Sequence, residues 1–217
     1  MGRTPLDLSI YLVTDTAMCS QFGVVATVSA AVGAGATAVQ LRDTDATDDE
    51  LVSLGRQVMA ALQDTDVAMV INDRVHLVEA VGADGAHVGQ SDLGIEQARA
   101  MLGPTAYLGL SVQTVEHVAA AGESADEGTL DYLGVGPVWG TTTKLDAAAP
   151  GGLETLRQIT ATSPWPCVAI GGITVERMQE VREAGAVGAA VVSAICGQPD
   201  VAVATRLLRT AWDGASR

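Results

Sequence analysis

The chain has 217 residues, of which 48% are hydrophobic and 18% are charged, as is typical of a globular protein with a full core. Its formal net charge of −14 argues against nucleic acid and against an anionic membrane surface as partners, because both are negatively charged. Local cations must therefore hold any phosphorylated substrate against an unfavourable overall field.

Three cysteines, Cys19, Cys167 and Cys196, are scattered along the chain without the spacing of a metal site. We interpret them as reduced thiols in the core of a cytoplasmic protein. No apolar segment typical of a signal peptide follows Arg3, and residues 184–195 are too short and too rich in glycine to span a membrane. The sequence leaves the oligomeric state open, a homo-oligomer included.

Apolar runs that predict strands alternate with stretches that predict helices from one end of the chain to the other. The predicted strands are residues 10–14, 38–41, 67–71, 86–88, 107–110, 132–135, 167–170 and 187–192. The predicted helices are residues 24–32, 48–62, 75–81, 95–102, 114–121, 153–162, 175–184 and 201–211. Thr47 and Thr174 are expected to cap helices, and Gly82 to end one.

Eight strand–helix units in strict alternation predict a single (β/α)8 TIM barrel over residues 1–217. A doubly wound open sheet is the competing architecture, but it usually contains fewer units. No linker or low-complexity segment divides the chain, so we expect one domain. The chemistry of such barrels lies at the carboxyl ends of the strands, where the loops carry the candidate residues.

Residues 67–92 contain two neighbouring parallel strands that end in polar residues. Asp73 follows the first strand and Asp92 follows the second, so both carboxylates are expected on the same rim of the sheet. Amides and a hydroxyl surround them, which suits Mg²⁺ held by few protein ligands and by substrate phosphates. On this stretch alone, strand-end turns explain the same residues equally well.

The polar residues after the strands fall into two groups. After strands two to five come Gln40, Arg42, Asn72, Asp73, Gln90, Asp92 and Ser111, which offer a metal site, a guanidinium and amides. After strands six to eight come Thr141, Thr142, Thr143, Lys144, Gly171, Gly172 and Ser193, which offer hydroxyls, an ammonium and bare backbone N–H groups.

Simpler interpretations compete with the second group. Gly171-Gly172 is either a tight turn or, with the helix that Thr174 opens, a phosphate site; we favour the phosphate site. The threonine run is either a solvated loop or part of the site, and Lys144 favours the site because it is the only lysine. We assign His76, His87 and Tyr11 to packing, although Tyr11 could stack on a planar ring.

Eight motifs resemble the thiamine phosphate synthase family, in the family's order and over nearly the whole chain. They are YLVTD (11–15), QLRD (40–43), INDR (71–74), VGADGAHVGQSDL (81–93), GLS (109–111), DYLGVGPVWGTTTK (131–144), AIGGI (169–173) and VVSAI (191–195). The resemblance implies a TIM barrel that joins a hydroxymethylpyrimidine diphosphate to a thiazole monophosphate. Its products are thiamine phosphate and pyrophosphate.

The resemblance also implies roles for individual residues. The pyrimidine diphosphate would be held by Gln40, Leu41, Arg42, Asp43, Thr44, Asn72, Ser111 and Lys144. Arg42, Ser111 and Lys144 among them would act in catalysis. Asp73 and Asp92 would bind Mg²⁺. The thiazole phosphate would be held by Thr141, Thr142, Thr143, Gly171, Gly172, Val192 and Ser193. One position departs from the family: its QxRxK segment usually has a lysine where this chain has Thr44.

The residue types favour electrostatic over covalent catalysis. We expect no nucleophile with a partnered base, so Mg²⁺, Arg42 and Lys144 would neutralise charge on a departing pyrophosphate. The alternatives are a thiazole tautomerase-like paralogue, a Schiff-base aldolase, and a phosphate-metabolite sensor without turnover. A tautomerase-like relative lacks the aspartates and the threonine loop, an aldolase needs its lysine in the barrel wall, and only Thr44 favours the sensor.

Overall fold

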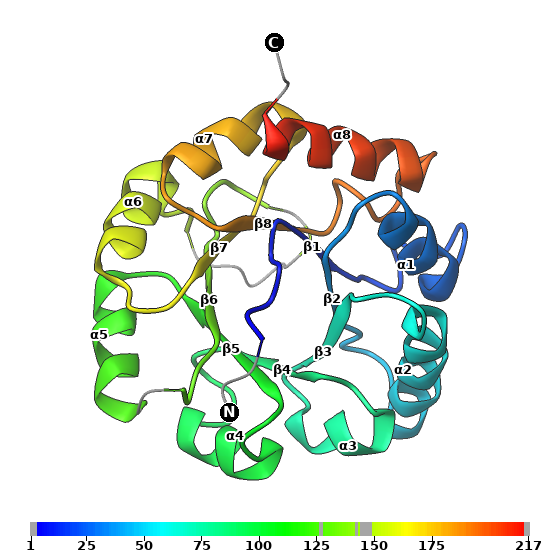
Figure 1. The fold of residues 1–217 in the computed structure, drawn as a ribbon, viewed down its shortest axis with the longest axis horizontal. Coiled ribbons are helices and arrows are strands. Elements are labelled where there is room, and N and C mark those ends of the chain that lie inside the picture. The colour runs from blue at the N-terminus through cyan, green and yellow to red at the C-terminus, as the bar shows by residue number, and fades with distance from the viewer. Residues whose placement is uncertain (1–3, 126–127, 142, 144–148, 215–217) are drawn as a thin grey trace.

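The computed structural model describes residues 4–125, 128–141, 143 and 149–214. Eight parallel strands close into a barrel in sequence order, and helices surround it (Figure 1). The strands are β1 (Ile10–Val13), β2 (Ala38–Leu41), β3 (Ala68–Asn72), β4 (Gly85–Val88), β5 (Tyr107–Val112), β6 (Tyr132–Val135), β7 (Cys167–Ile170) and β8 (Gly188–Val191). The predicted TIM barrel is thus confirmed, and the open sheet is excluded because β1 pairs with β8.

The helices are α1 (Val24–Gly33), α2 (Asp48–Leu62), α3 (Val78–Val81), α4 (Ile95–Leu102), α5 (Val115–Ser124), α6 (Gly152–Thr162), α7 (Met178–Glu183) and α8 (Val201–Asp213). Thr47 caps α2 in a reciprocal capping box with Glu50, as its sequence position predicted. Gly82 ends α3 in the left-handed conformation. No helix in these ranges combines the length and apolar character that a membrane span requires.

Two predicted helices begin differently from expectation. The segments before α3 and α7 are short 3-10 turns, Val75–Leu77 and Val175–Arg177, so each helical crossover tightens at its start. The side chain of Thr174 makes no capping hydrogen bond to a backbone N–H group there. Thr174 therefore does not open a full α-helix, which corrects the prediction and weakens the contribution of a helix dipole at the neighbouring glycines.

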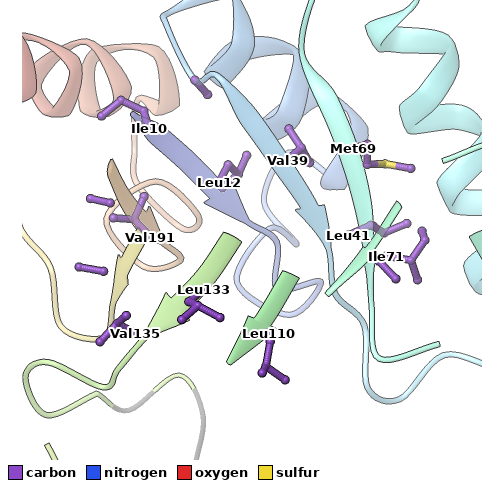
Figure 2. Close-up of a cluster of buried hydrophobic side chains, with 14 of the residues drawn as sticks. Ile10, Leu12, Val39, Leu41, Met69, Ile71, Leu110, Leu133, Val135 and Val191 are labelled. Carbon is purple, nitrogen blue, oxygen red and sulfur yellow. The ribbon is translucent and has the colours of Figure 1, made fainter. Parts of the chain in front are cut away.

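The core has two layers because side chains alternate along each strand. One set packs between the barrel and the helices; Figure 2 shows part of it, with labelled side chains from β1, β2, β3, β5, β6 and β8. The other set includes Tyr11, Val70, Tyr132 and Val168 and fills the barrel. Tyr11 of β1 contacts Tyr132 of β6, and these strands are not neighbours, so the contact crosses the interior.

The segment before β1 covers the amino end of the barrel (Figure 1). Leu8 is buried with the interior set and Leu6 packs against it. The Tyr107 hydroxyl donates to the carbonyl of Thr4 at 2.8 Å and ties this segment to the start of β5. With the amino end closed and the interior filled, the carboxyl ends of the strands are left to form a site.

Candidate active site

A cavity of about 840 Å³ lies at the carboxyl ends of the strands, within the size range of small-molecule sites. The predicted residues that line it are Gln40, Arg42, Thr44, Asn72, Asp73, Asp92, Ser111, Thr141, Thr143, Gly171, Gly172, Val192 and Ser193. The two predicted groups therefore surround one space.

Two predicted residues that the structure describes, Leu41 and Asp43, are not among those lining the cavity. Leu41 is fully buried in the layer between barrel and helices, where its Cδ2 would lie 3.3 Å from a Cβ added to Gly55 of α2. Asp43 accepts hydrogen bonds from two backbone N–H groups of its own loop, each at 3.0 Å. These two side chains support the site's framework, so only their backbone remains a candidate contact. Thr142 and Lys144 lie outside the described residues.

The guanidinium of Arg42 stands at the cavity wall beside Asp15. Its Nη1 lies 3.7 Å from Asp15 Oδ2, longer than a direct hydrogen bond, and both side chains are 19% exposed. The Thr14 hydroxyl fixes the backbone of Arg42 by accepting from its N–H at 2.9 Å and donating to its carbonyl at 3.2 Å. The backbone is thus held firmly and the side chain loosely, which suits a group that must turn toward an anion.

Asp73 occupies the left-handed region with φ of 57°, the only described residue other than glycine to do so. Its N–H donates to the carbonyl of His87 at 2.8 Å, and its Oδ2 accepts from the amide of Asn72 at 2.6 Å. Asp92 Oδ2 accepts from the N–H of Gly89 at 2.8 Å. Each carboxylate therefore accepts a hydrogen bond close to the end of its own strand.

These two carboxylates fit a hard divalent cation of the Mg²⁺ type. Within the described ranges, no group of three or more acidic, histidine or cysteine side chains is arranged to hold a metal. Two carboxylates in an 840 Å³ cavity leave most of a coordination sphere to water and to a ligand's oxygens. Mg²⁺ commonly binds in that way, through one or two carboxylates and substrate phosphates.

A chain of hydrogen bonds crosses the barrel beneath the cavity. The Gln40 amide donates to Tyr11 Oη at 2.9 Å, and Tyr11 Oη lies 2.7 Å from Tyr132 Oη. Tyr132 Oη lies 3.0 Å from His87 Nδ1, and His87 Nε2 lies 2.9 Å from Ser111 Oγ. Burial raises the pKa of both phenols, which therefore stay protonated.

This network changes several expectations about the site. His87 does more than pack, because it lines the cavity and contacts Ser111, although only 7% of it is exposed. Ser111 and His87 also form a hydroxyl–imidazole pair. We expected no hydroxyl beside a possible base, and the positions of these two side chains contradict that expectation. His76 is not a core residue: its side chain is 53% exposed, and its Nε2 lies 2.8 Å from Asp48 Oδ2. Tyr132 was not identified from the sequence as part of the site, although strand alternation directs its side chain into the barrel.

On the opposite side, the loop after β6 is joined to the turn after β7. The N–H of Trp139 donates to the carbonyl of Gly171 at 3.0 Å. Arg177 donates to the carbonyl of Gly172 and stacks on the Trp139 ring at 4.7 Å. A Cβ on Gly172 would lie 2.7 Å from the carbonyl oxygen of Gly140. The glycines are therefore required by close backbone approach, and both line the cavity.

Comparison with known proteins decides the family. The sequence model described as thiamine monophosphate synthase matches residues 10–195. The chain is 43% identical over 213 residues to the thiamine-phosphate synthase of Azorhizobium caulinodans, covering 98% of this chain and 99% of that protein. The chain belongs to the thiamine monophosphate synthase family.

Other members of the thiamine monophosphate synthase family agree with this assignment. The chain is 44% identical over 201 residues to the thiamine-phosphate synthase of a Psychrobacter strain, covering 93% of each. The solved thiamine phosphate pyrophosphorylase from Pyrococcus furiosus matches with a TM-score of 0.86 and 35% identity, over 95% of this chain and 96% of that one. The resemblance that the motifs indicated is confirmed, and with it an enzyme of the transferase class.

Position 44 is where the motif resemblance leads us to expect a lysine and this chain has Thr44. Thr44 lines the cavity in the loop that also presents Arg42. A threonine there offers a hydroxyl where the QxRxK pattern would offer a second cation. Among the residues that the structure describes, Arg42 is therefore the only arginine or lysine that lines the cavity.

Proposed function

We propose that the protein condenses hydroxymethylpyrimidine diphosphate with hydroxyethylthiazole phosphate to form thiamine phosphate and pyrophosphate. One observation supports this above all: in a chain of this family, a guanidinium and two oriented carboxylates share a cavity with a glycine turn. The first set suits a diphosphate with its metal, and the second suits a phosphate monoester. The cavity is large enough for both ligands at once.

The diphosphate would bind on the β2–β5 side. Arg42 would turn from Asp15 to the phosphate oxygens, with Asn72 and Ser111 as further hydrogen-bond donors. Asp73 and Asp92 would hold Mg²⁺, which when bound would neutralise charge on the diphosphate and on the departing pyrophosphate. Lys144 would add a second cation by its place in the sequence motif. Gln40 would contact the pyrimidine ring, because it lines the cavity although only 5% of it is exposed.

The thiazole phosphate would bind on the β6–β8 side. The N–H groups of Gly171 and Gly172, two residues that line the cavity, would donate to the phosphate oxygens together with Ser193. Thr141 and Thr143 would close over it from the β6–α6 loop, where the N–H of Thr143 already donates to Thr141 Oγ1 at 3.2 Å. This arrangement holds a dianion with neutral donors only, so it leaves the metal to the other substrate.

The reaction exchanges one bond for another. The bond from the pyrimidine methylene carbon to the diphosphate oxygen breaks, and its electron pair leaves with pyrophosphate. The lone pair of the thiazole nitrogen then forms the new carbon–nitrogen bond. No proton moves in either event, so neither a base nor an enzyme nucleophile is required, and Arg42 acts by stabilising charge on the leaving group. The cavity's main task is to hold the rings in line at about 3–3.5 Å.

Pyrophosphate release tests this function. The purified protein is expected to release pyrophosphate only when both substrates and Mg²⁺ are present, in equal amount to the thiamine phosphate formed. Omission of either substrate or of Mg²⁺ should stop release. If calorimetry detects binding of both substrates while no pyrophosphate appears, the chain is a sensor, as the threonine at position 44 alone would suggest. Failure to bind either substrate would contradict the proposal entirely.

A further inference from the structure

The hydrogen-bond chain from Gln40 to Ser111 joins five strands, β2, β1, β6, β4 and β5, through the barrel interior. Tyr11 is 2% exposed and Tyr132 is 1% exposed, so bulk water does not compete for their hydroxyls. Each phenol has one proton, and a neutral imidazole has one N–H donor and one acceptor nitrogen. The direction of each bond therefore constrains the next one along the chain.

The direction can be followed from Gln40. Its amide nitrogen donates to Tyr11 Oη, which leaves the Tyr11 proton for Tyr132. The Tyr132 proton then goes to His87 Nδ1, so the imidazole carries its own proton on Nε2. That N–H donates to Ser111 Oγ at 2.9 Å. Ser111 therefore accepts from His87, and its own hydroxyl proton can be donated to a ligand in the cavity.

The reverse direction is unfavourable. Tyr11 Oη would accept from both Gln40 and Tyr132, and its own proton would lack a partner among the described residues. A buried donor without an acceptor loses its hydration without compensation. Ser111 would then donate to His87 and present only lone pairs to the cavity. Diphosphate oxygens also accept only, so such a serine would repel the substrate proposed for this side.

We propose that Tyr132 is a positioning residue that acts through His87 and makes Ser111 a hydrogen-bond donor to the pyrimidine diphosphate. The proposal rests on the proposed function for the identity of that ligand. It also explains why the His87–Ser111 pair does not make Ser111 a nucleophile. Because Nε2 carries the proton, His87 donates to Ser111 and does not act as its base, so the pair is not set up for nucleophilic attack.

The tautomer of His87 can be measured without substrate. Nitrogen-15 NMR of the imidazole rings is expected to show the Nε2–H form for His87 in the wild-type protein. His76→Gln and His117→Gln assign the remaining signals by elimination. Tyr132→Phe removes only the hydroxyl that donates to Nδ1, so the tautomer populations should shift toward Nδ1–H. Tyr107→Phe is the matched control, because it removes another hydrogen-bonded phenol at the opposite end of the barrel.

Kinetics provide the second readout. Tyr132→Phe should lower kcat/KM for the pyrimidine diphosphate by about 3- to 10-fold, the effect of one neutral hydrogen bond, and leave KM for the thiazole phosphate unchanged. In a Ser111→Ala background the same substitution should add little, because it acts through Ser111. Tyr11→Phe tests the preceding link if Tyr132→Phe does not fold.

Two results would overturn the proposal. One is an Nδ1–H tautomer in the wild-type protein, which would mean that the chain runs in the reverse direction. The other is an equal loss from Tyr132→Phe with and without Ser111, which would mean a general structural effect. A protein with the expected tautomer but no pyrophosphate release would contradict the proposed function alone, so the two failures can be told apart.

Discussion

Gly172→Ala should destabilise the protein and weaken its affinity for the thiazole phosphate. Gly172 has a φ of +64°, and for a residue with a Cβ the left-handed region costs about 1–2 kcal/mol. The added Cβ would also lie 2.7 Å from the carbonyl oxygen of Gly140 and 2.8 Å from Trp139 Cβ. Relieving such a clash typically costs a further ~1–3 kcal/mol. The expected loss in free energy of unfolding is therefore about 2–5 kcal/mol.

The site of the clash also explains the functional effect. The sequence alone suggests that a side chain at Gly172 would block the phosphate itself. In the structure the same space is occupied by the backbone of the β6–α6 loop, which carries Thr141 and Thr143. The substitution would displace that loop, so KM for the thiazole phosphate should rise while KM for the pyrimidine diphosphate changes little.

Gly82→Ala is the matched control for this experiment. Gly82 has a φ of +78°, but a Cβ there would have no atom within 4 Å. It should lose only the ~1–2 kcal/mol of the backbone term, without effect on either KM. Urea denaturation gives both free energies of unfolding, and steady-state kinetics gives both KM values. Equal destabilisation of the two variants with unchanged kinetics would refute the role assigned to the Gly172 contact.

Three further predictions concern the charges around the cavity. Asp73→Asn and Asp92→Asn should each reduce turnover most strongly at limiting Mg²⁺, measured as initial rate across a Mg²⁺ titration; wild-type rates there would refute the metal assignment. Thr44→Lys should lower KM for the pyrimidine diphosphate by about 10- to 150-fold at low salt, the effect of one charge-assisted hydrogen bond, and an unchanged KM would mean that another cation serves this position. Arg177→Leu should cost about 1–3 kcal/mol in urea denaturation, because it loses the Gly172 hydrogen bond and the stacking on Trp139; no loss would make that contact dispensable.

The barrel could be predicted because short stretches of sequence mark each of its strands and helix ends. Short apolar runs that end in polar residues mark buried parallel strands, and Gly82 and Thr47 mark helix ends through their own backbone and side-chain chemistry. The positions of the polar residues after each strand then place most of the site, because parallel strands end on one rim. The two groups of side chains around the cavity follow from this pattern alone.

What could not be predicted depends on contacts across the barrel. Tyr11 and Tyr132 are 121 residues apart and on strands that are not neighbours, so no local pattern indicates their hydrogen bond. The left-handed backbone of Asp73 and the loose ion pair of Arg42 with Asp15 likewise depend on how neighbouring strands end. The motif also does not show that the Leu41 side chain faces the helices, because a motif marks a whole segment whereas strand alternation sends neighbouring side chains to opposite faces.

A crystal structure with thiamine phosphate, pyrophosphate and Mg²⁺ bound would show where each half of the reaction binds. We expect pyrophosphate beside Arg42, with the metal between it and the carboxylates of Asp73 and Asp92. The phosphate of thiamine phosphate should accept from the N–H groups of Gly171 and Gly172, without a metal. Pyrophosphate at the glycine turn, or a metal away from both aspartates, would contradict the division of the cavity into these two halves.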